Sequence, residues 1–461
     1  MDGVSTAILL LLLAVISLSL TFTSWGKGQL PPGPKPLPIL GNLLQLRSQD
    51  LLTSLTKLSK DYGSVFTVYL GPRRVIVLSG YQTVKEALVD KGEEFSGRGS
   101  YPIFFNFTKG NGIAFSDGER WKILRRFSVQ ILRNFGMGKR SIEERILEEG
   151  SFLLDVLRKT EGKPFDPVFI LSRSVSNIIC SVIFGSRFDY DDERLLTIIH
   201  FINDNFQIMS SPWGEMYNIF PSLLDWVPGP HRRVVAKTLT TILLHQFPAC
   251  NDYRSQPTAR SSDLTLPCTP TNLFQSQPFL RKHHLLLSPS TARVQEEIDC
   301  VVGRSRMPTL EDRASMPYTD AVIHEVQRFA DVIPMNLPHR VIRDTPFRGF
   351  LIPKGTDVIT LLNTVHYDSD QFKTPQEFNP EHFLDANQSF KKSPAFMPFS
   401  AGRRLCLGEP LARMELFIYL TSILQNFTLH PLVEPEDIDL TPLSSGLGNL
   451  PRPFQLCMRI R

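Results

Sequence analysis

The chain has 461 residues, of which 42% are hydrophobic and 21% charged, and it contains 32 phenylalanines. This length allows one large domain or two to three average ones, and the apolar content is ample for a large core. A net charge of +4 is too small over this length to indicate a nucleic-acid-binding protein. The six cysteines show no C-x-x-C motif and no paired spacing, which argues against a zinc site or a disulfide scaffold and favours a reducing compartment.

The N-terminal residues are predicted to form a membrane segment. No charged residue lies between Gly3 and Gly26, and about 20 apolar residues suffice to span a bilayer. A cleaved signal peptide is the alternative, but we find no clear small-residue cleavage site. Asp2 precedes the segment and Lys27 follows it, so the positive-inside rule predicts that the rest of the chain lies in the cytosol.

Hydrophobic periodicity along the chain predicts a mainly helical protein with a small β region. Helices are expected at residues 51–62, from 118 onward, and at 141–159, 167–184, 193–208, 319–330 and 411–424. Strands are expected as a hairpin formed by 64–70 and 75–79, and as short pieces within 342–362. Loops are expected at the aromatic segment 101–107 and at residues 221–230 and 444–453.

The stretch from residue 247 to residue 292 breaks this pattern. It contains six prolines, six serines and no glycine, and it shows no helical periodicity. Prolines recur too often for a long helix, because each one removes a backbone donor and clashes with the preceding turn. The composition therefore predicts an irregular segment.

One cysteine lies in a setting that indicates chemistry. Cys406 stands between Gly402 and Gly408, and the pattern after it predicts a helix that begins at Glu409-Pro410. A cysteine at a helix N-terminus is expected to have a lowered pKa, since free backbone N–H groups and the helix dipole favour the thiolate. The thiolate is the form that binds metal. The alternative is an ordinary buried cysteine in a loop.

The ten residues from Phe399 to Gly408 read F-S-A-G-R-R-L-C-L-G and contain the pattern F-x-x-G-x-R-x-C-x-G. This pattern resembles the haem-binding loop of the cytochromes P450, in which a cysteine thiolate is the axial ligand of the haem iron. The resemblance covers residues 30–246 and 293–461, and it is nearest to the membrane-bound, microsomal family-2 type. It implies that Cys406 is the catalytic thiolate and the metal ligand.

The resemblance also implies an architecture and an activity. The expected fold is the P450 fold with an N-terminal membrane anchor at 1–26, a proline-rich hinge at 27–40 and a haem-thiolate catalytic domain at 41–461. The implied cofactor is haem b, with electrons from NADPH delivered by a flavoprotein reductase and cytochrome b5 as a further donor. The implied reaction inserts one oxygen atom from O2 into a lipophilic xenobiotic, fatty acid or steroid. The catalytic domain is expected on the cytosolic side of the endoplasmic reticulum membrane.

Family positions imply which residues contact haem and substrate. The haem contacts, including the donors to its propionates, are expected to be Arg98, Trp121, Arg125, His339, Phe399, Gly402, Arg404, Cys406 and Gly408. The substrate contacts are expected to be Phe104, Phe107, Ile113, Phe115, Phe201, Asn205, Val332 and Leu337. For His339 the expected contact is a hydrogen bond from its Nε–H to a carboxylate.

Three further residues are predicted to be structural. Glu325 and Arg328 lie three residues apart on a predicted helix, an arrangement that is common by itself. In this chain they resemble the buried Glu–Arg pair that braces the P450 fold behind the haem. The usual third partner is an arginine in a Pro-Glu-Arg-Phe segment, and here the segment reads Pro-Glu-His-Phe, with His382 in its place. The third leg of this brace is therefore expected to be weaker.

The irregular stretch is the major departure from the family. Residues 247–292 stand where the family has its long central helix, with a small-residue, glycine, acid and threonine cluster beside the bound oxygen. We find no such distal acid/threonine motif in the chain. Two alternatives to an active monooxygenase therefore stay open: a haem-binding but catalytically impaired variant, and an unstable product without haem, since loss of a central helix exposes apolar surface.

Overall fold

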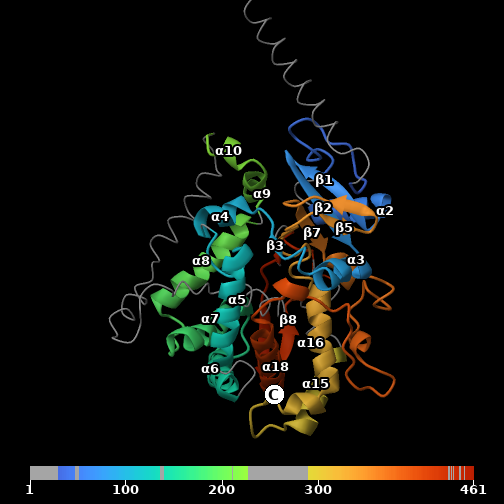
Figure 1. Ribbon diagram of the computed structural model, residues 1–461. Helices are drawn as coiled ribbons and strands as arrows, with labels where there is room; N and C mark the ends of the chain where they lie inside the picture. Colours follow the sequence, from blue (N-terminus) through green and yellow to red (C-terminus); the bar gives the residue numbers. More distant parts are fainter. Residues whose placement is uncertain are drawn as a thin grey trace, which may run out of the picture.

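The computed structural model describes residues 30–46, 51–108, 110–134, 140–209, 211–226, 289–434, 437, 439, 441–445, 448–450 and 452–461. In this part of the chain helices predominate, and a five-stranded sheet lies beside them (Figure 1). The predicted mainly α fold with a small β region is confirmed.

The main sheet is built on the predicted hairpin. Its strands in spatial order are β1 (Val65–Leu70), β2 (Arg73–Ser79), β7 (Asp357–Leu361), β4 (His339–Arg340) and β3 (Gly97–Arg98). The hairpin turns at Gly71, whose φ of 61° suits glycine. β7 adds to β2 in parallel, so a distant part of the chain completes the sheet. Helix α2 (Leu51–Tyr62) packs its buried Leu55 against the hairpin.

Three smaller antiparallel pairs complete the β structure. They are β5 (Thr345–Phe347) with β6 (Phe350–Ile352), β8 (Phe427–Pro431) with β11 (Leu456–Ile460), and β9 (Ser444–Ser445) with β10 (Asn449–Leu450). The last pair lies within 444–453, so the loop expected there contains a short hairpin.

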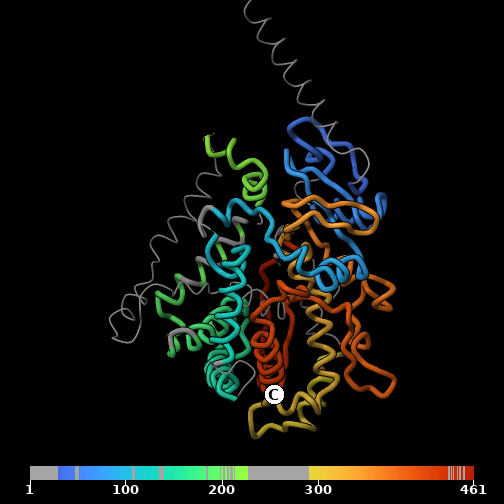
Figure 2. Tube along the Cα trace, in the orientation of Figure 1, coloured from blue at the N-terminus to red at the C-terminus, as the bar shows by residue number. Residues whose placement is uncertain are grey.

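Helix α18 (Glu409–Asn426) is the centre of the helical part. Every residue from Met414 to Gln425 is buried, as expected for a helix with apolar neighbours all round. Figures 1 and 2 show α18, in red, between α16 (Pro317–Ala330) in yellow and a teal-to-green group of helices. That group comprises α5 (Gly118–Asn134), α6 (Arg140–Arg158), α7 (Pro167–Phe184) and α8 (Glu193–Met209). Residue 406 lies just before the start of this helix.

Shorter helices and turns connect these parts. They are α3 (Tyr81–Lys85), the π-helical turn η1 (Glu86–Asp90), α4 (Pro102–Thr108), α9 (Pro212–Ile219), α10 (Pro221–Leu224), α15 (Pro289–Val301), η3 (Asp312–Ser315), α17 (Asn363–His366), η4 (Pro380–Phe383) and η5 (Gly402–Arg404).

Three of these elements correct the sequence-based expectations. The aromatic segment 101–107 is helical from Pro102 onward, because a helix turns Ile103 and Phe104 inward, where both are buried. The loop expected at 221–230 begins with α10, which has proline at its first position, where its missing N–H costs no hydrogen bond. Residues 289–292, expected to be irregular, form the first turn of α15.

Some predictions fall on other parts of the chain. The anchor 1–26, the first residues of the hinge and residues 247–288 lie outside the described residues. Among the described helices, none combines the length and the apolarity that crossing a membrane requires.

Candidate functional site

The cysteine loop is folded tightly against η1. Gly402 has a φ of 68°, and a Cβ atom on it would lie 1.7 Å from the carbonyl oxygen of Leu88. No side chain fits such an approach, so this position requires glycine. The loop then turns back on itself: the N–H of Cys406 donates to the carbonyl of Phe399 over 3.1 Å. Phe399 is buried, which anchors the start of the loop.

Cys406 lies just before the start of α18, as predicted, but its pKa is not lowered. Burial raises the pKa to about 11, because it disfavours the charged form. The backbone N–H groups of Gly408 and Glu409 and the charge of Arg125 act in the opposite direction and do not outweigh burial. The expectation of a lowered pKa is therefore wrong for the thiol alone. A coordinated metal cation deprotonates a thiol outright, so a bound cation would reverse the effect of burial on this thiol.

Arg404 joins the loop to the neighbouring elements. Its guanidinium donates to the carbonyls of Ser96 and Ser116 over 2.7 and 3.0 Å, and to the carboxylate of Asp117 over 3.1 Å. It also lies 3.8 Å from the centre of the Trp121 ring, a close cation–π contact. Burial lowers its pKa to about 10.

Two more arginines lie beside it. Arg125 donates to the carbonyl of Leu405, the residue before the cysteine, over 2.9 Å. Arg98 is buried and donates to the carbonyl of Ala114 over 2.8 Å. Burial, reinforced by the charge of Arg404, lowers the pKa of Arg98 to about 9. Burying like charges is costly without a counter-charge.

The charge on this cluster of three arginines shows whether the site suits the acidic groups of a haem. Asp117 is the one carboxylate that contacts them among the described residues, and its side chain is 43% exposed. The cluster therefore carries excess positive charge in a buried place. Carboxylates of a bound ligand would neutralise that charge through strong charge-assisted hydrogen bonds. A thiol, a glycine-lined loop and three cations fit a flat ring with acidic substituents.

His339 lies in β4, next to Arg98 in the sheet. Its Nδ1 is 2.8 Å from the carbonyl of Phe95 and therefore carries the proton. Its Nε2 is 3.4 Å from the amide nitrogen of Asn336 and acts as an acceptor. Burial and the charges of Arg98 and Arg404 lower the pKa of His339 to about 3, so the ring is neutral. The predicted Nε–H donor thus needs a second proton, which a nearby carboxylate would favour.

The predicted substrate contacts divide into two groups. Phe104 of α4 stacks on Phe115 with ring centres 4.1 Å apart. Phe115, Val332 and Leu337 are partly buried and pack against the same core, and Ile113 is half-buried. The side chains of three further candidates lie outside the described residues: Phe107, Phe201 and Asn205.

Sequence reasoning missed two partners of the loop. Asp117 binds Arg404 and also caps the backbone N–H of Gly118 over 2.9 Å. An aspartate directly before a predicted helix is a capping signal, so this residue was detectable. Leu88, whose carbonyl contacts Gly402, was not detectable from the sequence, because the two residues meet only in the folded chain.

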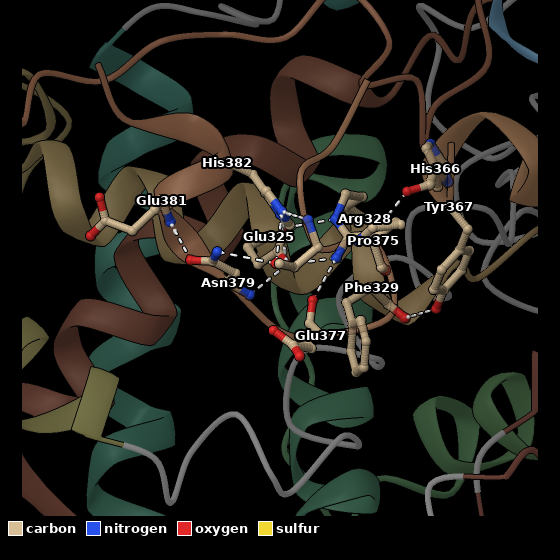
Figure 3. Close-up of polar contacts among 11 residues, drawn as sticks. Glu325, Arg328, Phe329, His366, Tyr367, Pro375, Glu377, Asn379, Glu381 and His382 are labelled. Atoms are coloured by element: carbon tan, nitrogen blue, oxygen red, sulfur yellow. Dashed lines mark hydrogen bonds and ion pairs between the residues drawn. The ribbon is translucent and has the colours of Figure 1, made fainter. Parts of the chain in front are cut away.

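The predicted brace is present between α16 and η4. Arg328 and Glu325 form a buried pair, and His382 lies with its Nδ1 3.3 Å from both carboxylate oxygens of Glu325 (Figure 3). The N–H of Thr374 donates to Nε2 of His382 over 3.1 Å, so the histidine uses both of its nitrogens. The three residues are therefore brought together as expected.

Comparison with known proteins identifies the family. The family described as Cytochrome P450 matches residues 31–255 and 283–458. The chain is 83% identical to "Cytochrome P450 2F2" of Rattus norvegicus over 500 aligned positions, 78% identical to "Cytochrome P450 2F2" of Mus musculus over 500, and 72% identical to "Cytochrome P450 2F1" of Homo sapiens over 494. All three alignments cover 100% of this chain and 100% of the relative. The chain belongs to the cytochrome P450 family.

This membership establishes the class of chemistry. The protein is a haem-thiolate monooxygenase that inserts one oxygen atom from O2 into an organic substrate. Its cofactor is haem, and its electrons come from NADPH through a flavoprotein reductase. It is related to the microsomal P450s, which belong to the endoplasmic reticulum membrane.

The comparisons also mark the irregular stretch. The family match is interrupted between residues 255 and 283, inside the segment that sequence analysis singled out. The alignment with the rat relative spans 500 positions while the chain has 461 residues, so at least 39 aligned positions hold no residue of this chain.

Proposed function

We propose that Cys406 is the axial ligand of the haem iron and that the arginine cluster beside it binds the haem propionates. One observation carries the proposal: Arg404 belongs to the cysteine loop and Arg125 donates to the carbonyl of Leu405 in that loop, so these two cations and the thiol belong to one site. Trp121 holds the guanidinium of Arg404 from one face. Gly402 keeps the loop against Leu88.

The remaining donors complete the binding of the acid groups. Arg98 faces the same cluster from β3, and its lowered pKa reflects burial without a full counter-charge. His339 becomes a donor when a propionate stabilises its second proton. When bound, haem supplies the oxygen activation and substrate oxidation. The residues of the chain bind and orient the ring and keep the sulfur in a shielded place.

A lipophilic substrate is supported by the aromatic side chains at the positions predicted to contact it. The stacked Phe104 and Phe115 present apolar rings from α4 and the segment before α5. Small-molecule sites are lined mainly by apolar and aromatic side chains. We assign Phe104, Ile113, Phe115, Val332 and Leu337 to this lining, together with the predicted contacts in α4 and α8.

The membrane arrangement follows from the sequence. Residues 1–26 anchor the protein, residues 27–40 form the hinge, and the positive charge after the apolar segment favours a cytosolic catalytic domain. Protease added to sealed microsomes tests this orientation. A cytosolic domain is digested without detergent, whereas a lumenal domain is digested only after detergent is added.

Turnover tests the activity. The full-length protein in microsomes, with added reductase and NADPH, is assayed for oxidation of a fatty acid, a steroid and an aromatic foreign compound, with and without cytochrome b5. The proposal expects NADPH-dependent product from at least one lipophilic substrate, and none from the Cys406→Ser variant. Equal product from the two proteins would contradict the role of Cys406.

A second candidate function is haem binding without turnover. The interrupted family match favours it, since the interruption between residues 255 and 283 falls in the stretch where the resemblance places the oxygen-activating helix. A thiolate-ligated haem spectrum combined with no NADPH-dependent product from any substrate would support this candidate over the active enzyme.

A further inference from the structure

Arg413, in the first turns of α18, connects three groups around the cysteine loop. Its Nε donates to the carboxylate of Glu409 over 2.9 Å, an i,i+4 pair on the same helix. Its guanidinium lies 5.3 Å from the ring centre of Phe399 and 5.4 Å from that of Phe396. Glu409 follows Cys406 and Phe399 precedes it, so Arg413 contacts both ends of the loop.

The fourth contact of Arg413 is with His324 of α16. Nη1 of Arg413 donates to Nε2 of His324 over 2.9 Å. An arginine cannot accept a hydrogen bond, so this imidazole nitrogen must be unprotonated. Nδ1 of His324 is 2.7 Å from the backbone carbonyl of Asp320, which can only accept, so Nδ1 carries the proton. The two contacts define one tautomer of a neutral ring.

The surroundings of His324 hold this ring in place. Its side chain is 2% exposed, and its ring centre lies 5.4, 4.6 and 4.8 Å from those of Phe383, Phe390 and Phe396. Burial lowers its pKa, which keeps the acceptor available to Arg413. The carboxylate of Asp320 is 3.2 Å from Nδ1, but Arg313 also binds that carboxylate over 2.6 Å and shares its charge.

We propose that His324 is a positioning residue of the cysteine loop: it fixes Arg413, and Arg413 clamps Glu409 and Phe399 on the two sides of Cys406. This inference rests on the proposed role of Cys406 as the iron ligand. Neither His324 nor Arg413 touches the reacting atoms. Their effect is to hold the loop still and to keep the carboxylate of Glu409 paired, because a free anion beside the sulfur would disfavour the thiolate.

Two substitutions at His324 test the roles of the two ring nitrogens separately. His324→Gln places an amide oxygen where Nε2 accepts from Arg413, while His324→Asn places an amide N–H where Nδ1 donates to Asp320 and does not reach Arg413. Both are neutral, polar and similar in size. The full-length proteins are compared by amide hydrogen exchange of the peptide containing residues 399–409, by the rate at which the thiolate spectrum is lost on warming, and by the reduction potential.

The proposal expects a difference between these two variants. In His324→Asn the peptide exchanges about tenfold faster and thiolate loss accelerates about tenfold, the change for losing one hydrogen bond from a charged group. The reduction potential falls, since an unpaired Glu409 opposes electron addition. In His324→Gln all three quantities stay within about twofold of the parent protein, given the precision of such comparisons.

Other outcomes overturn it. If both variants match the parent protein, His324 does not position the loop. If both variants lose the thiolate spectrum equally fast, and amide exchange is faster throughout α16 and α18, the histidine is a packing residue only. Hydrogen exchange needs no haem, so it tests the clamp even if the parent protein lacks a thiolate spectrum, a result that would count against the proposed function instead.

Discussion

Arg328 donates two hydrogen bonds to Glu325, over 2.7 and 2.6 Å, with both side chains fully buried. The other donors of the guanidinium bind the carbonyls of His366, Pro375 and Glu377 over 2.8 to 2.9 Å. The pair therefore connects α16 to the segment that follows β7 (Figure 3).

Removing one member of this pair should be severe. We expect Arg328→Met to cost about 3–5 kcal/mol, because it leaves the carboxylate of Glu325 buried and unpaired. Thermal unfolding of the full-length protein in detergent measures the loss. The exposed pair of Arg452 and Asp439 provides the control: Arg452→Met should change the free energy of unfolding by less than about 1 kcal/mol. Equal effects of the two changes would show that the buried pair contributes no more to stability than the exposed pair.

His382 offers a finer test of the same brace. An arginine at this position can donate to Glu325, but it cannot accept the hydrogen bond that the N–H of Thr374 donates to Nε2. We expect His382→Arg to destabilise the protein by about 1 kcal/mol, the typical net contribution of the hydrogen bond that the partly buried N–H of Thr374 loses. A variant as stable as the parent protein, in the same unfolding assay, would show that the Thr374 contact is dispensable.

Gly402 should tolerate no side chain. Gly402→Ala puts a Cβ atom against the Leu88 carbonyl and also forces alanine into a positive φ. Gly355 shares the positive φ, at 80°, but nothing lies within 4 Å of its Cβ position. Gly355→Ala therefore carries only the backbone strain, about 1–2 kcal/mol. We expect the thiolate spectrum to be lost in Gly402→Ala and kept in Gly355→Ala; retention in both would mean that the loop adapts.

Glu415 predicts a dependence of stability on pH. Its side chain is buried in α18, neither carboxyl oxygen has a hydrogen-bond partner among the described residues, and burial raises its pKa well above 4.5. The folded protein therefore holds a proton that the unfolded chain releases, so this residue lowers stability as the pH rises above about 4.5.

Glu415→Gln keeps the shape of the protonated acid and removes this dependence. We expect its stability advantage over the parent protein to grow by about 1.4 kcal/mol per pH unit, up to the pKa of the buried group. Unfolding temperatures of both proteins at about pH 5, 6 and 7 measure the trend. A constant difference across these values would show that Glu415 is ionised in the folded protein.

Local residue patterns predicted much of the fold and of the candidate site. The cysteine loop, the start of α18 and the pair of Glu325 and Arg328 were all predictable, because each depends on residue types at fixed, short spacings. Most helix boundaries followed for the same reason, since apolar periodicity and proline positions act within a few residues.

The unpredicted features depend on residues that are distant in the sequence. The pKa of Cys406 is raised because the folded core surrounds the sulfur, which no local pattern records. Segment 101–107 is helical in a setting where Phe104 stacks on Phe115, a contact between residues eleven positions apart. The second hydrogen bond of His382 comes from Thr374. In each case tertiary contacts, and not local preference, decide the outcome.

The central claim is that Cys406 holds haem as a thiolate despite the unusual segment 247–292. The difference spectrum of the reduced, carbon-monoxide-bound protein in expressed membranes tests it most directly, with Cys406→Ser measured alongside. We expect a strongly red-shifted Soret band for the parent protein and its absence in the serine variant. A band at the shorter wavelength of thiolate-free haem in the parent protein, or an unchanged red-shifted band in the variant, would contradict it.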